Sequence, residues 1–266
     1  MNKVLAAVDN SLAARPVLAT ARALGELLDA RPEALHVQTN GDRTARSTAE
    51  SAGVPLRTST GPVVQRLVDA GGADDVVALV VGARSTPAGR PLGATATAVA
   101  TALLKPVVVV PPDARAPETL ARVLVPLEAS LPASRAPRTI LELAPEATID
   151  VLALHVLEED AIPLFTDQPQ HEHAAWTGEF LARYCPWGVG SISLETRVGR
   201  TDEVVPLAAE EFACDIVALG WSRELAPGRA PVVRATLERS RVPVMLVPVD
   251  LAPDGTLAGA GAATSG

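Results

Sequence analysis

Two loops carry most of the residues that could hold a small molecule. The first follows the apolar run from Lys3 to Val8 and contains Asp9, whose carboxylate can accept hydrogen bonds from a base or a sugar. The second runs from Gly82 to Thr95 and leads into an Ala- and Thr-rich segment with a helical composition. The free N–H groups at the start of a helix favour phosphate, and glycine lets the backbone approach a ligand closely. Together the two loops predict a site for a phosphate-bearing ligand.

The second loop also supplies polar side chains. Arginine neutralises phosphate charge, and serine and threonine hydroxyls donate hydrogen bonds. The candidate ligand-binding residues are Asp9, Gly82, Arg84, Ser85, Gly93 and Thr95. A purely structural interpretation remains open, in which Asp9 caps the following helix and the glycines only shape the loop.

Catalytic and metal-binding patterns do not stand out. The sequence has no Gly-x-Ser-x-Gly turn and no Walker A loop. His171 and His173 form the one histidine cluster, which we expect to be a solvated helix start rather than a metal site. His36 and His155 lie at matching strand ends, where a packed, hydrogen-bonded imidazole is expected. We therefore assign no catalytic residue and no metal ligand, and expect binding rather than strong catalysis.

The elements that position these loops occur twice. Residues 3–12 resemble residues 122–131, and Ala34-Leu35-His36-Val37 recurs as residues 153–156. Residues 75–79 recur as 215–219, and residues 105–111 recur as 242–248. Four matched blocks in one order indicate a tandem repeat. We expect domains at 1–113 and 119–250, a Pro-rich linker at 114–118, and a tail at 251–266 too poor in bulky residues to bury a core.

Each repeat alternates strand and helix patterns. In the first, strands are predicted at 3–8, 34–38, 55–60, 76–81 and 107–110, with helices after residue 11 and at 63–70 and 95–104. Residues 41–53 are short and polar and predict only a turn of helix, whereas the second repeat has a helical pattern at 171–183. Ser11 and Ser130 are placed to cap the first helix of each repeat. The fold class is α/β, with two tandem doubly wound, five-stranded parallel sheets. Such sheets bind ligands outside the carboxyl ends of their strands, which is where both loops lie.

Composition narrows the classes of partner. The net charge of −8 disfavours nucleic acid, and no apolar run approaches the ~20 residues of a membrane span. Cys185 and Cys214 form no Cys-x-x-Cys pair. We expect reduced, buried or half-buried thiols in a cytoplasmic protein without nucleic-acid or membrane partners.

The order of these motifs resembles the universal stress protein family over residues 1–250. The resemblance implies a fold like the adenine nucleotide alpha hydrolases. It also implies a loop of the form G-x2-G-x9-G-S/T that binds ATP or a related adenine nucleotide such as AMP. In such a site Asp9 takes the place of the Asp after the first strand and Val37 that of the Val after the second. Gly82 and Gly93 match the first and third loop glycines.

The chain departs from the family pattern at the loop. Ser85 stands at the second glycine position, seven residues instead of nine separate it from Gly93, and Ala94 precedes Thr95 where Ser or Thr is expected. The second repeat departs further, with Ala230 and Pro231 at the third glycine and the position after it. Its weaker candidate site comprises Glu128, Val156, Gly220 and Ser222, and Trp221 would crowd the crevice or stack on a base.

Two functions follow from the resemblance. The first is a stress-response regulatory protein that binds an adenine nucleotide better in its N-terminal half. The alternative is a family member without nucleotide that acts through protein–protein interaction or dimerisation. In the family the last strand mediates dimerisation, so we expect 107–110 to pair with 244–247 within one chain, and a homodimer is a further option.

Overall fold

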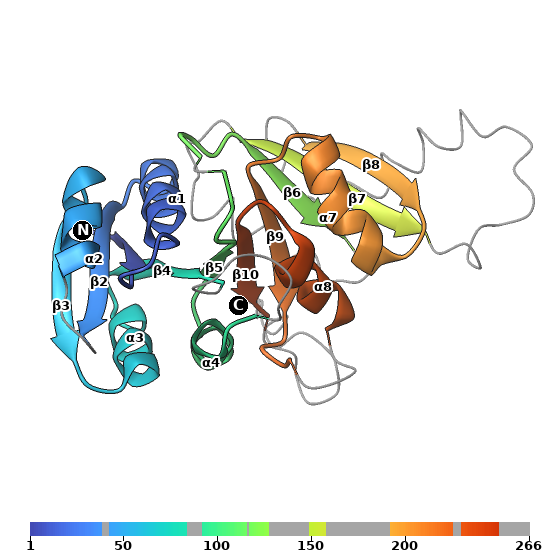
Figure 1. Ribbon diagram of the computed structural model, residues 1–266. Helices are drawn as coiled ribbons and strands as arrows, with labels where there is room; N and C mark the ends of the chain where they lie inside the picture. The colour runs from blue at the N-terminus through green and yellow to red at the C-terminus, as the bar shows by residue number, and fades with distance from the viewer. Residues whose placement is uncertain are drawn as a thin grey trace, which may run out of the picture.

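A single sheet runs through the whole molecule (Figure 1). The computed structural model describes residues 1–38, 43–83, 92–115, 117–127, 149–157, 192–225 and 230–249. Within these residues, ten strands lie in the order β3-β2-β1-β4-β5-β10-β9-β6-β7-β8. Counted from the centre of the sheet outward, the second half thus has the same strand order as the first.

The elements of the first half follow the predicted alternation. They are β1 (Lys3–Ala7), α1 (Ala14–Leu27), β2 (Arg31–Gln38), α2 (Arg43–Ser51), β3 (Leu56–Thr60), α3 (Val63–Gly71), β4 (Val76–Gly82), α4 (Ala94–Ala102) and β5 (Val107–Val110). The four strand pairs of this half are all parallel. The predicted α/β fold with five-stranded parallel sheets is confirmed.

The second half has the same plan. Its described elements are β6 (Arg122–Pro126), β7 (Asp150–Leu157), β8 (Ile192–Val198), α7 (Thr201–Glu211), β9 (Ile216–Trp221), α8 (Pro231–Arg239) and β10 (Val244–Pro248). These strands also pair in parallel. The helix predicted at 171–183, the cap predicted for Ser130 and the tail at 251–266 lie outside the described residues.

The core consists of two apolar layers, one on each face of the sheet. Side chains alternate between the faces along each strand, so Val4 and Ala6 join one layer and Leu5 the other. The first layer is closed in the first half by α1 and α2, through residues such as Leu18 and Ala49. The second is closed by α3, α4, α7 and α8, which lie on the opposite face (Figure 1). Both layers continue across the two halves.

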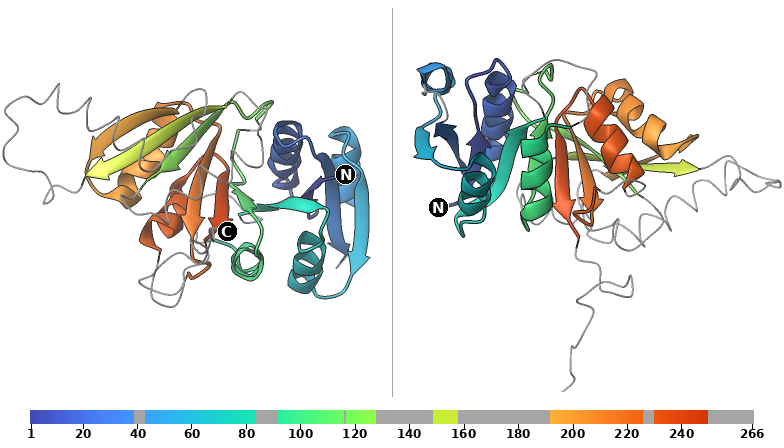
Figure 2. Two further views of the ribbon diagram at one scale, coloured as in Figure 1. Left: turned by 180° about the vertical axis from the view of Figure 1, so that it is seen from behind. Right: turned by 60° about the horizontal axis from the view of Figure 1, so that its bottom comes forward.

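The halves meet at an antiparallel pair of strands. Val107, Val108 and Val109 of β5 stand opposite Leu246, Met245 and Val244 of β10. The two strands lie side by side at the centre of the molecule in both views of Figure 2. The pairing predicted within one chain is confirmed, and it removes two edge strands that would otherwise expose their backbones.

Helix α2 corrects one prediction. Residues 41–53 were expected to hold only a turn of helix, but Arg43–Ser51 form a nine-residue helix. Ala45 and Ala49, four residues apart, are fully buried and give this polar segment an apolar stripe. In the sequence, two alanines among polar residues were too weak an apolar pattern to predict the full helix.

The sheet register also corrects the alignment of the two halves at one block. The letters match Leu79 with Leu219, but the backbone N–H groups of Leu79 and Val217 make the equivalent bonds, each at 3.0 Å, to Pro106 and Pro243. The pairing of β1 with β4 is irregular between Lys3 and Val4, so β4 begins earlier relative to its partner. As a result Gly82 is equivalent to Gly220, and Ala83 to Trp221.

Among the helices that the structure describes, none combines the length and the apolar character needed to cross a bilayer.

Candidate functional site

A cavity of about 730 Å³ opens at the carboxyl ends of β1, β2 and β4. The chain leaves β1 toward β2 on one side, while β4 lies on the other, so this is where the strand order reverses. The loop after β1 and the starts of α1, α3 and α4 complete the walls. The lining residues are Ala7, Val8, Asp9, Asn10, Ser11, Ala13, Ala14, Val17, Leu35, His36, Val37, Val63, Leu67, Val81, Gly82, Ala83, Gly93, Ala94, Thr95 and Ala96.

The structure brings five of the predicted site residues to this one cavity. Asp9, Val37, Gly82, Gly93 and Thr95 all line it. They come from four different elements or loops, and the parallel sheet aligns their strand ends on one edge. Arg84 and Ser85, which were predicted with them, lie outside the described residues.

Asp9 serves a structural role as well as lining the cavity. Its Oδ1 accepts hydrogen bonds from the Ser11 backbone N–H at 2.9 Å and the Ser11 hydroxyl at 2.5 Å. The Ser11 hydroxyl oxygen in turn accepts from the Ala13 N–H at 3.2 Å, just before α1. Asp9 therefore does not cap α1, whose N-cap residue is Ala13 with no side-chain cap, but its carboxylate fixes the preceding turn and lines the cavity.

The start of α4 forms the wall opposite Asp9 along the sheet edge. Gly93 donates its N–H to the Ala83 carbonyl at 2.8 Å, and this bond joins the two ends of the long loop. By helix geometry the N–H groups of Ala94, Thr95 and Ala96 have no carbonyl partner within α4. Gly93 provides no side chain to cap them. All three residues line the cavity, so this wall is suited to an anion.

Two lining residues escaped the sequence-based assignment. His36 is 3% exposed, and its Nδ1 lies 2.9 Å from the Val8 carbonyl oxygen. The equivalent His155 Nδ1 lies 3.1 Å from the Leu127 oxygen, so the packed, hydrogen-bonded imidazoles are confirmed. Asn10 Oδ1 accepts from the Ala45 N–H of α2 at 3.0 Å. In the sequence, the position of His36 directly before the candidate residue Val37 could have indicated that it lines the site. The contact of Asn10 joins residues 35 positions apart, so no local pattern indicated it.

The equivalent region of the second half is filled differently. Val156, Gly220 and Ser222 are in the described part and Glu128 is not. Trp221, at the position of Ala83, is 4% exposed and belongs to the same apolar layer as Leu154 and Val233. Pro231 begins α8, as its place in the sequence predicted, after Ala230 in a left-handed conformation with φ of 45°. The proline has no N–H to offer a ligand.

In the part of the chain that the structure describes, no three His, Cys, Asp or Glu side chains come together as a metal site requires. His171 and His173 are outside that part.

The second half of the chain matches a known protein family. Residues 119–248 match the model of the universal stress protein family. These residues thus form a domain of the universal stress protein family. The tandem arrangement agrees with the ten-stranded sheet, in which the first half has the strand order of the matched half. The cavity lies outside the matched segment.

Solved structures support the fold over nearly the whole chain. A universal stress protein from Archaeoglobus fulgidus DSM 4304 is 17% identical, with a TM-score of 0.62, and the match covers 93% of this chain and 96% of that one. A putative universal stress protein from Pseudomonas aeruginosa UCBPP-PA14 is 15% identical, with a TM-score of 0.63 and 93% coverage of both chains. A functionally unknown protein from Pseudomonas aeruginosa PAO1 is 12% identical, with a TM-score of 0.66, and covers 93% of this chain and 92% of its own. Among curated proteins, none matches the sequence.

Proposed function

We propose that this universal stress protein is a cytoplasmic regulatory protein that binds an adenine nucleotide, ATP or AMP, in its N-terminal cavity without strong catalysis. The observation that carries the proposal is the cavity of about 730 Å³ with an anion-favouring helix start on one wall and a carboxylate on another. Pockets for small ligands are typically about 300–1,000 Å³, so the volume suits a nucleotide.

The chemistry of the walls supports the same ligand. Apolar side chains of Val17, Val37 and Leu67 can pack against the faces of a flat base. Asp9 can accept hydrogen bonds from the base or the ribose, and the first turn of α4 can hold a phosphate. The ligand in this proposal spans the sheet edge from β2 to α4.

The contrast between the halves supports a preference for the N-terminal one. Ala83 leaves room beside the strand ends, whereas the buried indole of Trp221 occupies the equivalent position. The start of α4 has N–H groups at Ala94 and Thr95, whereas Pro231 removes a donor at the start of α8. We therefore expect one nucleotide per chain.

The geometry of His36 supports a binding role over a catalytic one. An effective general base must reach the proton that it abstracts. The Nδ1 of His36 is held at the Val8 carbonyl, and the residue is nearly buried. The imidazole therefore serves as part of the cavity wall.

Isothermal titration with AMP and ATP tests the proposal. We expect binding with a stoichiometry near one, and a loss of at least about tenfold in affinity for Asp9→Ala, which is ~1.4 kcal/mol. Asp74→Ala is the matched control, because Asp74 is an exposed carboxylate before β4, at the amino end of the strands. It should bind as wild type does.

The same titration decides against the proposal if wild type binds neither nucleotide. In that case the alternative, a family member that acts through protein–protein interaction, takes its place. Adenine nucleotide that co-purifies with the protein in near-stoichiometric amount would exclude that alternative.

A further inference from the structure

Arginines without partners gather on the outer side of α1. Several described cations form ion pairs: Lys3 bonds Glu33 and Asp75, and Arg197 bonds Glu195 and Glu211. The side chains of Arg15 and Arg22 form no ion pair or hydrogen bond within the described residues. Both side chains are exposed and no carboxylate in the described part of the chain neutralises them, so they leave a positively charged patch on one helix of a chain whose net charge is −8.

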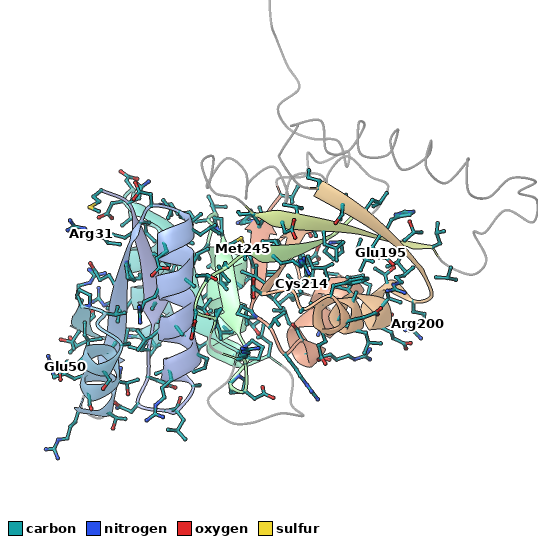
Figure 3. All side chains as sticks on the ribbon, turned by 90° about the horizontal axis from the view of Figure 1, so that it is seen from above. Arg31, Glu50, Glu195, Arg200, Cys214 and Met245 are labelled. Atoms are coloured by element: carbon teal, nitrogen blue, oxygen red, sulfur yellow. The ribbon has the colours of Figure 1, made fainter. Side chains whose placement is uncertain are left out.

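The two arginines line one groove between α1 and α2. They are seven residues apart, which is two helical turns, so both side chains leave the same face of α1. The groove measures about 290 Å³, and its other wall carries the hydroxyl groups of Ser47, Thr48 and Ser51. None of the lining residues is acidic, and Glu50, the acidic residue of α2, is not among them. Figure 3 views this side from above, with Glu50 labelled on α2.

Of the three hydroxyl groups in the groove, two already donate their protons within α2 and one does not. Thr48 Oγ1 donates to the Thr44 carbonyl and Ser51 Oγ to the Ser47 carbonyl, each at 2.8 Å. Their protons are thus used within the helix. Ser47 is not tied in this way, so its hydroxyl can donate to a ligand together with the two guanidinium groups.

We propose that this groove binds the phosphoryl group of a small phosphorylated molecule, at a second site separate from the nucleotide cavity. Guanidinium groups present a planar fork of donors that matches phosphate oxygens, and two of them can embrace one phosphoryl group or a pyrophosphate. A volume of 290 Å³ is below the usual range for a nucleotide pocket but holds a phosphate ester or a pyrophosphate. The site does not depend on the proposed function of the cavity.

Titration with inorganic phosphate and with pyrophosphate at low ionic strength tests the site. We expect wild type to bind pyrophosphate more tightly than phosphate, with an affinity that falls as salt is added. The double variant Arg15→Gln/Arg22→Gln should bind pyrophosphate at least about tenfold more weakly. The matched control is Arg200→Gln/Arg241→Gln, which removes the same charge from side chains that are 73% and 74% exposed in the other half. It should stay within about twofold of wild type.

Three outcomes would overturn the proposal. Wild type fails to bind either anion; or both double variants lose affinity equally, which would mean attraction to overall charge; or Arg15→Gln/Arg22→Gln binds pyrophosphate as tightly as wild type, which would place the anion elsewhere, as in the cavity. The two proposals can fail separately, because nucleotide binding to the cavity can be absent while pyrophosphate still binds the groove. Unchanged circular dichroism of the exposed-surface variants confirms that each remains folded.

Discussion

Burial of Cys214 suppresses the reactivity of its thiol. It follows α7, is 4% exposed, and lies in the apolar layer with Val205 and Ala209. Burial raises the pKa of its thiol to about 11, although the nearby Arg122 opposes that shift. Since the thiolate is the reactive species, a thiol with such a pKa is inert at neutral pH.

We therefore expect Cys214 to resist alkylation in the folded protein. At pH 8, iodoacetamide should label it at least about tenfold more slowly than in urea-unfolded protein, as read by mass spectrometry of its peptide. The unfolded thiol ionises near its ordinary pKa, below that of the folded one, so the unfolded state loses its proton first. This contribution to the free energy of unfolding is intact below about pH 9 and is lost as pH rises toward 11. Rapid labelling of the native protein at pH 8 would contradict this account.

The candidate site shows what residue types alone could predict. Asp9, Gly82, Gly93 and Thr95 stand directly beside strand or helix ends, and the rule that ligands bind at those ends brought them together. Val37 was predicted only through the family resemblance. Asn10 could not be assigned, because its partner in α2 is a backbone N–H whose position depends on the folded chain. Trp221, by contrast, was expected from the sequence to crowd the crevice or stack on a base, and the structure buries its side chain at the position equivalent to Ala83.

At the scale of elements, α2 is a short helix with few buried residues. It buries only Ala45 and Ala49, and short helices are marginal without tertiary support. Asn10, from the cavity, accepts the N–H of Ala45 in the first turn of α2 at 3.0 Å. One side chain thus links the wall of the cavity to the helix that borders the arginine groove.

Replacing Asn10 should loosen α2 at its first turn. Removal of a side chain that accepts a first-turn N–H costs about 0.5–2 kcal/mol. For Asn10→Ala we expect faster hydrogen exchange in the peptide that spans residues 43–51, with little change in α3 or α4. The matched control is Asn2→Ala, at an exposed residue before β1, at the amino end of the strands. Unchanged exchange across 43–51 in Asn10→Ala would show that the contact does not hold the helix.

Strand and helix positions were predictable to within a few residues where the apolar pattern is strong. The boundaries of β5 agree completely, while β2 starts earlier than expected, at Arg31, because Arg31 to Glu33 pair with Lys3 to Leu5. Pairing with a neighbour extended this strand through Pro32, a residue that a single-strand pattern argues against. Failures of sequence reasoning thus arise where a neighbouring element decides the conformation.

On the scale of the whole molecule, the β5–β10 pair joins the halves into one body. The four valines of β5 are at most 1% exposed, and both apolar layers pass through this seam. Because a buried layer unfolds as a cooperative unit, we expect damage on one side of the seam to destabilise the other.

Val108→Asp tests this coupling directly. Val108 is fully buried opposite Met245, so a carboxylate there is left without a partner and should lower the free energy of unfolding by about 3–5 kcal/mol. The chain's three tryptophans, at 176, 187 and 221, all lie in the second half, whereas the substitution is in the first. Tryptophan fluorescence in a urea titration therefore reports on the second half, and we expect its midpoint to fall together with that of circular dichroism. Leu104→Asp, at a side chain that is 69% exposed beside β5, should change the free energy by no more than about 0.5 kcal/mol. If Val108→Asp leaves the fluorescence midpoint at its wild-type value, the two halves unfold independently, and the seam joins them without sharing stability between them.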